Sequence, residues 1–265
     1  MRPVFIIAEG GSTHDGDLGK AMALIHAAAA AGADAIKFQT FRAKTLAARR
    51  GAPESIYAAY ELPLEWVPTL KDAADAAGVE WMTTCYHADY LPLIRRYIKR
   101  WKIASFEAGD EDFVLAHLPY GLPVLISTGM VSALVLAWLK WLSGQKSEWD
   151  VRLLHCVSAY PPTLADLNLA AIRRHGLDGF SDHSGWVEAG GLAVAAGARI
   201  VETHLRLDET NPKNPDFPHS LTPACFRAYI RRIREVESAM GNGERDGPAK
   251  CEAEMARYRV LGHSA

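Results

Sequence analysis

The sequence predicts an α/β protein, a single-domain TIM (β/α)8 barrel. A short apolar run followed by an amphipathic stretch recurs eight times along the chain, as expected for parallel strands joined by helices. The runs are apolar through their middles, as in strands covered on both faces. The length of 265 residues also fits one barrel, since such barrels commonly have about 250 residues. We expect residues 1–240 to form the catalytic barrel and residues 241–265 a C-terminal tail or docking arm.

The elements follow from this periodicity in order. Strands are predicted at residues 4–8, 35–40, 80–84, 101–105, 124–127, 151–156, 179–182 and 199–204. Helices are predicted at residues 17–31, 64–77, 90–97, 113–118, 132–142, 167–174, 187–196 and 226–240. Gly32, Gly78 and Gly197 each follow an alanine-rich helix, where glycine readily forms a left-handed cap. The two long connections, 41–63 and 205–223, indicate functional loops.

Composition and charge exclude several classes of protein. With 29 basic and 31 acidic side chains and no long basic run, the chain lacks the electrostatic footprint of a nucleic-acid-binding protein. The first apolar run, residues 4–8, is too short for a signal peptide or a membrane helix, so we expect a cytoplasmic protein. The four cysteines are far apart without C-x-x-C spacing, and we expect reduced thiols rather than disulfides or a zinc site.

Polar residues stand at the end of every predicted strand. The carboxyl ends of barrel strands surround the active site. In chain order these residues are Glu9, Lys37, Gln39, Thr83, Thr84, Lys102, Ser105, Glu107, Ser127, Thr128, His155, Ser158, Tyr160, Ser181, Asp182, His183, Glu202 and His204. The sequence therefore predicts an active site at this end of the barrel.

Some of these residues predict an anion site. Lys37 and Lys102 are costly to bury unpaired, and an anionic substrate would supply their partner. Serine hydroxyls and the backbone N–H groups after Ser127 suit a phosphate group. The alternative is a structural ion pair for each lysine and a capping role for each serine. Five such residues converge at this end of the barrel, and this convergence favours the anion site. They are Lys37, Lys102, Ser105, Ser127 and Ser181.

Histidines and carboxylates at the same end predict metal and proton chemistry. His183 and His204 end consecutive strands, so two neutral imidazoles can meet at one divalent cation. Each could instead be a hydrogen-bonded core histidine. Rival ligands are His14, His87, His155 and His219. Glu9 suits a general acid or base if burial raises its pKa, and Glu107 suits a similar role toward a sugar hydroxyl, unless either carboxylate merely pairs with a lysine.

Taken together, these motifs resemble the sialic acid (N-acetylneuraminate) synthase family, whose members condense phosphoenolpyruvate with an amino sugar aldehyde. The resemblance spans most of the chain. It rests on the segments Ile7-Ala8-Glu9, Thr13-His14-Asp15-Gly16, Ala31-Gly32-Ala33-Asp34-Ala35-Ile36-Lys37-Phe38-Gln39-Thr40, Lys102-Ile103-Ala104-Ser105, Ser127-Thr128-Gly129-Met130, Leu154-His155-Cys156, Tyr160-Pro161, Ser181-Asp182-His183 and Glu202-x-His204.

The resemblance implies a role for each matching position. A phosphoenolpyruvate site is implied at Lys37, Thr84, Lys102, Ser105, Ser127, Ser158 and Ser181. His183 and His204 match the metal ligands, and Glu9 matches the acid/base carboxylate. Glu107, Tyr160 and Asp216 match positions near the acceptor sugar. By this analogy Mn2+ (with Mg2+ or Co2+ as alternatives) polarises the aldehyde, C3 of phosphoenolpyruvate attacks it, water adds at C2, phosphate leaves, and a 2-keto-3-deoxy sugar acid forms.

The chain also departs from the family pattern. The usual Asn-His-Asn-Gly reads Thr13-His14-Asp15-Gly16, the usual proline after the third-strand threonine is Cys85, and Phe217 replaces a histidine expected after Pro-Asp. The family's C-terminal antifreeze-like domain, which lends an arginine to the neighbouring subunit, has no counterpart before Ala265. We therefore expect altered acceptor contacts or a separate capping protein, in a homodimer formed by the barrel itself.

The same residues are compatible with two other functions. One is a metal-dependent aldolase, lyase or isomerase on the same barrel, because a fold alone does not fix a reaction. The other is a non-catalytic subunit that binds a metabolite.

Overall fold

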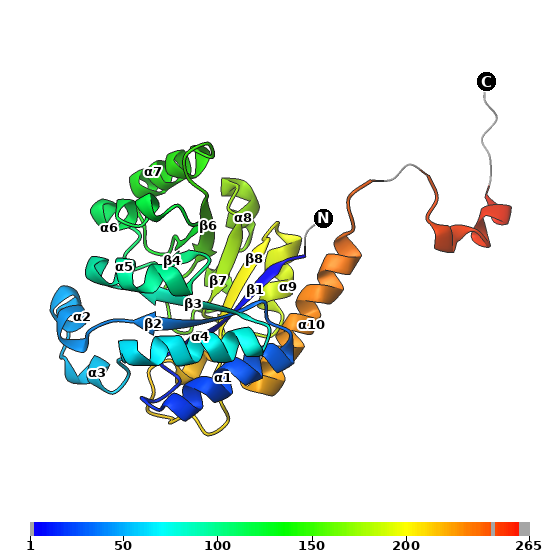
Figure 1. Ribbon diagram of the computed structural model, residues 1–265. Coiled ribbons are helices and arrows are strands. Elements are labelled where there is room, and N and C mark those ends of the chain that lie inside the picture. The colour runs from blue at the N-terminus through cyan, green and yellow to red at the C-terminus, as the bar shows by residue number, and fades with distance from the viewer. Residues whose placement is uncertain (1–2, 245–246, 260–265) are drawn as a thin grey trace.

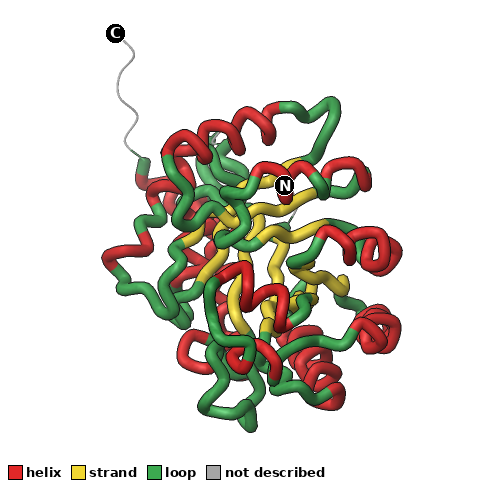
Figure 2. The backbone as a smooth tube through the Cα atoms, turned by 90° about the vertical axis from the view of Figure 1, so that its left-hand side faces the viewer, coloured by secondary structure: helices red, strands yellow, loops and turns green. Residues whose placement is uncertain are grey.

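The computed structural model describes residues 3–244 and 247–259. Eight parallel strands form a closed barrel in sequence order, with β8 paired to β1. The strands are β1 (Phe5–Gly11), β2 (Ala35–Thr40), β3 (Glu80–Cys85), β4 (Trp101–Ile103), β5 (Val124–Ser127), β6 (Val151–Cys156), β7 (Gly179–Asp182) and β8 (Ile200–His204). Figure 2 shows the strands at the centre with helices around them. The predicted TIM barrel is confirmed.

The helices lie on the outside of the barrel. They are α1 (Leu18–Ala31), α2 (Ala43–Arg50), α3 (Ser55–Ala58), α4 (Val67–Ala76), α5 (Leu91–Ile94), α6 (Glu111–Leu115), α7 (Ala133–Gly144), α8 (Ala170–His175), α9 (Ala189–Ala195) and α10 (Pro223–Met240). Local signals define their ends. Asp17 caps α1 by accepting a hydrogen bond from the backbone N–H of Lys20, and Gly32 ends it in the left-handed conformation, as predicted.

Strands β2, β5, β6 and β7 have the predicted bounds, and the other four differ at their ends. Strand β1 is longer than predicted and runs to Gly11, whereas β4 stops at Ile103, so Ser105 lies just after it. The connection 41–63 was predicted only as a loop, but it contains α2 and α3. Helix α2 consists largely of alanine, lysine and arginine, which favour helix without the apolar periodicity on which the prediction relied.

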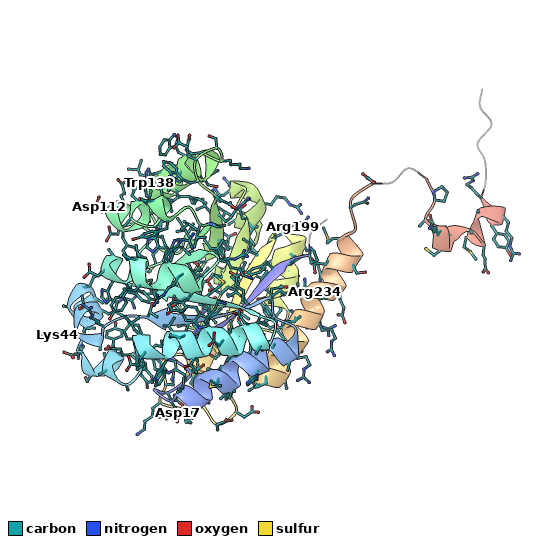
Figure 3. All side chains as sticks on the ribbon, in the orientation of Figure 1. Asp17, Lys44, Asp112, Trp138, Arg199 and Arg234 are labelled. Atoms are coloured by element: carbon teal, nitrogen blue, oxygen red, sulfur yellow. The ribbon has the colours of Figure 1, made fainter. Side chains whose placement is uncertain are left out.

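The main core lies between the strands and the surrounding helices. Its largest fully buried members include Trp81, Trp101, Phe38 and Phe180, all on strands. Helix α7 contributes unevenly: Leu142 is fully buried, whereas Leu134 and Trp141 are exposed. Figure 3 shows Trp138 on α7 at the periphery of the molecule. The apolar side chains of α7 therefore lie partly against the barrel and partly on the surface.

Side chains that point into the barrel form layers. The lower layer is an apolar cluster of Ile7, Ala35, Met82, Leu125 and Leu154. Side chains of a strand alternate between its two faces, so the next inward position lies two residues further on. At that position β1, β2, β3, β5 and β6 carry Glu9, Lys37, Thr84, Ser127 and Cys156. The interior thus changes from apolar to polar within one step, and the apolar layer lies directly beneath the polar one.

The segment after α10 was predicted as a tail or docking arm, of which residues 245–246 and 260–265 lie outside the described residues. Residues 247–259 are exposed and contain the short 3-10 helices Lys250–Glu252 and Met255–Tyr258. Figure 1 shows these helices away from the barrel. The division of the chain at residue 240 stays a prediction.

Candidate active site

A cavity of about 340 Å3 opens at the carboxyl ends of the strands. Eleven of the predicted site residues line it, namely Glu9, Lys37, Thr84, Lys102, Ser105, Ser127, Tyr160, Ser181, His183, His204 and Asp216. The other two, Ser158 and Glu107, each hydrogen-bond to a residue that lines it. The volume lies within the range of about 300–1,000 Å3 that is typical of ligand pockets. The structure therefore brings the predicted residues together.

Two lysines and two glutamates form the polar floor of the cavity. Lys37 pairs with Glu9, which lies opposite it in the β1–β2 ladder. The Nζ of Lys37 also lies 3.3 Å from Oε1 of Glu202, whereas that of Lys102 lies 3.4 Å from Oε2. Ser181 donates a 2.7 Å hydrogen bond to the same Oε2. Each lysine thus has a carboxylate partner, as the structural alternative anticipated, but both lysines also face an open cavity.

Burial and charge shift the pKa values of these groups in different directions. Burial raises the pKa of Glu9 despite the nearby Lys37. Burial lowers the pKa of Lys102, and this effect outweighs the attraction of Glu202. For Lys37 the attraction of Glu202 and Glu9 outweighs burial, so its pKa is raised. An added anion favours the charged form of both lysines and so opposes the effect of burial on Lys102.

Hydroxyl groups surround the two lysines. Lys37 donates to Thr84 Oγ1 at 3.1 Å, and Lys102 donates to Ser127 Oγ at 2.7 Å. Ser158 Oγ donates to Ser105 Oγ at 2.7 Å, although the two residues follow different strands. Gly129 lies against Ser158, where a Cβ atom would clash with the hydroxyl. These groups supply the donors that a phosphate or carboxylate requires.

Histidines and a carboxylate form a second group on the wall of the cavity. His204, Asp216 and His219 offer ligand atoms that all lie within 4.8 Å of one another. His183 is not part of this group, but its ring centroid lies 5.4 Å from that of His204. Nδ1 of His183 is 2.9 Å from the carbonyl oxygen of Val157. Burial lowers the pKa of His183 to about 4, so the ring is neutral at pH 7 and suited to metal binding.

Asp216 is held in place by the end of β1. The backbone N–H of Ser12 donates to Asp216 Oδ2 at 2.9 Å, and the Ser12 hydroxyl lies 2.7 Å from the same oxygen. Asn214 donates a 2.8 Å hydrogen bond to the carbonyl of Ser12 and so ties the two loops together. Gly11 has φ +45°, and a Cβ atom there would lie 2.5 Å from Asp216 Oδ2. Glycine at this position therefore allows the carboxylate to approach β1.

The mouth of the cavity is aromatic and carries one arginine. Arg50, at the end of α2, has its guanidinium 4.7 Å from the ring centroid of Phe106 and 5.1 Å from that of Tyr86. It donates to Glu107 Oε1 at 3.0 Å. Burial raises the pKa of Glu107 although Arg50 lowers it. Opposite them, Tyr160 is 41% exposed, and its ring centroid lies 4.4 Å from that of His183.

Comparison with known proteins identifies the family. A model described as the NeuB family matches residues 24–245. The chain belongs to the NeuB family. The predicted enzyme class is thereby confirmed: the protein is a synthase that condenses phosphoenolpyruvate, a transferase.

Relatives within the NeuB family are similar over nearly the whole chain. N,N'-diacetyllegionaminic acid synthase of Legionella pneumophila is 34% identical, and the alignment covers 91% of this chain and 74% of that protein. Pseudaminic acid synthase of Campylobacter jejuni is 33% identical over 92% of this chain and 77% of its own length. The crystal structure of N-acetylneuraminic acid synthetase from Leptospira borgpetersenii matches with a TM-score of 0.89 at 31% identity, covering 97% of this chain and 92% of that chain.

NeuB-family enzymes use a divalent metal, and the donors present here fit one. Nδ1 of His204 is buried without a hydrogen-bond partner among the described residues. Two imidazoles and a carboxylate suit Mn2+, Mg2+ or Co2+ with differing affinity. None of the helices in residues 3–244 and 247–259 has the length and apolar character needed to span a membrane.

Three residues of the cavity had no role in the sequence analysis of this NeuB-family chain, or only a secondary one. Glu202 appeared only among the strand-end residues and in a motif, without a role of its own, although its spacing of two from His204 on one strand places both side chains on the same face. His219 was named only as a rival ligand. Arg50 carried no signal, because it lies in a connection without apolar periodicity.

Proposed function

We propose that this enzyme condenses phosphoenolpyruvate with an aldose or an N-acetyl amino sugar aldehyde, giving a 2-keto-3-deoxy sugar acid and phosphate. The names of its relatives favour a nonulosonic acid product, such as a sialic, legionaminic or pseudaminic acid. The observation that carries the proposal is the pair of buried lysines, Lys37 and Lys102, which face the cavity within a ring of hydroxyl groups.

In this proposal the floor of the cavity binds phosphoenolpyruvate. Lys37 and Lys102 pair with its negative charges, and hydroxyl groups donate hydrogen bonds to its oxygens. The hydroxyl donors are Thr84, Ser105, Ser127, Ser158 and Ser181. In the absence of substrate, Glu9 and Glu202 balance the two lysines. Burial already raises the pKa of Glu9. An incoming anion brings a further negative charge, which repels the carboxylate and so favours the protonated form of Glu9.

Glu9 is then the acid/base residue of the reaction. Gln39 donates a 3.0 Å hydrogen bond to Glu9 Oε1 and fixes the orientation of the carboxyl group. A protonated Glu9 gives its proton to the aldehyde oxygen as C3 of phosphoenolpyruvate forms the new C–C bond. The carboxylate so formed accepts a proton from the water that adds at C2. The bond from C2 to the phosphate oxygen then breaks, the C2 hydroxyl gives its proton to the departing phosphate, and the 2-keto group forms.

The acceptor occupies the wall and mouth of the cavity. His183 and His204 are proposed to hold the divalent metal, most simply Mn2+, with Mg2+ or Co2+ as alternatives. The bound metal supplies Lewis acidity that polarises the acceptor aldehyde. Glu107, Tyr160 and Asp216 orient the hydroxyl and acyl groups of the sugar. Arg50 adds a guanidinium that donates to acceptor oxygens, stacked between aromatic rings.

The test is phosphate release from phosphoenolpyruvate, with Mn2+, over a panel of aldoses and N-acetylated amino sugars. The proposal predicts that phosphate is released only when a suitable acceptor is present and that a chelator abolishes this release. Mass spectrometry should then detect a 2-keto acid product. The Lys102→Met variant should lose this activity, whereas Lys44→Met, at an exposed position of α2, should keep it. Turnover of a keto acid or a sugar phosphate without phosphoenolpyruvate would instead support the aldolase, lyase or isomerase alternative.

The same proposal includes a homodimer and a cytoplasmic location. Sedimentation of the purified protein tests the first, and fractionation of the source cells tests the second. A separate capping protein stays a prediction.

A further inference from the structure

His219 is a buried histidine, and no hydrogen bond between the described residues accounts for its burial. Its side chain is 1% exposed. Neither ring nitrogen has a hydrogen-bond partner within the part of the chain that the structure describes. Buried polar atoms are normally hydrogen-bonded, and an unsatisfied one costs about 1–3 kcal/mol. A histidine that served only packing would leave two such atoms unpaired.

The surroundings of His219 supply what a cation needs. Its Nε2 lies 3.7 Å from Asp216 Oδ1, and its ring centroid lies 4.5 Å from that of His204. Nδ1 of His204 lies 3.9 Å from the other oxygen, Oδ2. These separations are too long for hydrogen bonds but short enough for the atoms to share one ion, since metal–ligand distances are about 2.0–2.2 Å. Both histidines thus have an unpaired nitrogen beside the same carboxylate.

Neighbouring contacts fix the carboxylate without using its second oxygen. Ser12 contacts Oδ2 of Asp216, whereas Oδ1 faces His219. Such outer contacts orient metal ligands and strengthen binding. The ring centroid of Tyr160, which also lines the cavity, lies 5.0 Å from that of His219. The three donors therefore converge on one point of the cavity wall.

We propose that His219 and Asp216 are protein ligands of the divalent metal in addition to His183 and His204, with His204, Asp216 and His219 as the closest donors. This inference rests on the proposed function for the use of the metal in the reaction, but not for metal binding itself. It also changes the role of Asp216, which was expected near the acceptor sugar: in this chain the carboxylate binds the cation first and meets the acceptor through it. Phe217 stands where the resemblance led us to expect a histidine, and His219 supplies an imidazole two residues later.

The test measures metal binding without substrates. Metal-free protein is titrated with MnCl2 by calorimetry, and free Mn2+ is counted by electron paramagnetic resonance. His219→Ala and His219→Asn should both bind Mn2+ about 100-fold more weakly, because loss of even an outer partner of a ligand costs about 10- to 100-fold. His175→Ala, on α8, is the matched control and should bind as the wild type does. Electron spin-echo modulation of bound Mn2+ should show fewer coupled imidazole nitrogens in His219→Asn.

Folding and phosphoenolpyruvate binding are measured in parallel. Both variants should keep the melting behaviour of metal-free wild type and the thermal shift that phosphoenolpyruvate causes. Wild-type Mn2+ affinity in either folded variant, with unchanged nitrogen coupling, would overturn the proposal. Such a result would not contradict the synthase reaction, provided that the wild-type protein releases phosphate in the presence of an acceptor. Conversely, His219-dependent metal binding in a protein that shows no acceptor-dependent release would sustain the metal site and refute the reaction.

Discussion

Replacing Glu202 by glutamine probes the charge balance of the cavity floor. Glu202→Gln keeps the size of the side chain and its contact with Ser181 but removes its charge. The carboxylate lies 3.3 Å from Lys37 and 3.4 Å from Lys102 and is almost fully buried. The neighbouring lysines hold the pKa of Glu202 well below its usual value, although burial acts to raise it. The substitution therefore leaves two buried ammonium groups with Glu9 as their remaining carboxylate.

The expected loss of stability is large. At this separation each pair attracts with about 5 kcal/mol at an effective dielectric constant of about 20, and desolvation opposes most of that gain. Removing one partner of a buried ion pair typically costs about 3–5 kcal/mol. A loss of about 3 kcal/mol lowers the Tm of a protein of this size by roughly 6–12 °C. Surface pairs are worth less than about 1 kcal/mol, so Glu235→Gln on α10 provides the control.

Differential scanning calorimetry with and without phosphoenolpyruvate measures both parts of this prediction. Because the ligand brings negative charge to the two lysines, it should raise the Tm of Glu202→Gln by more than that of wild type. A Tm without ligand as close to wild type as that of Glu235→Gln would refute the assigned ion pairs. An equal ligand shift in Glu202→Gln and wild type would refute the placement of the anion beside them.

Three further predictions concern other parts of the site. Lys102→Ala should weaken phosphoenolpyruvate binding, measured by calorimetry, by at least about tenfold, since a charged hydrogen bond is worth about 1.5–3 kcal/mol; unchanged affinity would remove Lys102 from the anion site. Gly11→Ala should lower stability by about 1–2 kcal/mol in thermal melts, because of its positive φ, and should weaken Mn2+ binding by displacing Asp216; normal values of both would contradict the role given to this glycine. The pKa of Asp15 is lowered by hydrogen bonds that outweigh burial, so its stabilising effect is present above the unfolded pKa and lost as pH falls through the folded pKa. Asp15→Asn should therefore destabilise the protein in urea unfolding at pH 7 and progressively less below about pH 4; a constant difference across that range would count against it.

The sequence was sufficient for the fold because each strand is a short apolar run between clear turns. It also predicted that Lys37 and Lys102 come together at one end of the barrel, where both line the cavity, since they stand at strand ends where burial without partners is costly. It did not reveal that Glu202 connects both lysines, because that contact depends on how strands far apart in sequence point into the barrel. The register of a closed barrel is a tertiary property.

The two loop residues Arg50 and His219 were harder to assign for another reason. Their positions depend on loop conformations that carry no periodic signal. Arg50 reaches the cavity because α2 forms within the long connection after β2. His219 meets His204 because the last connection folds back over the barrel, where Leu221 pairs with Leu205. Only the three-dimensional path of these loops shows which of several histidines come together.

The pairing of β1 with β8 makes the site a reporter of complete folding. Glu9 pairs with His204 across the seam between these two strands. Ser12, just after β1, donates a hydrogen bond to Asp216, which lies in the connection after β8. Residues from the beginning and the end of the barrel must therefore meet before Glu9 lies beside His204 and Asp216 is held near it. During synthesis the nascent chain has neither the seam nor the histidine–carboxylate group until the last strand and its following loop have emerged. If the proposed site carries the reaction, we expect no turnover of phosphoenolpyruvate by chains in which β8 has not yet paired with β1.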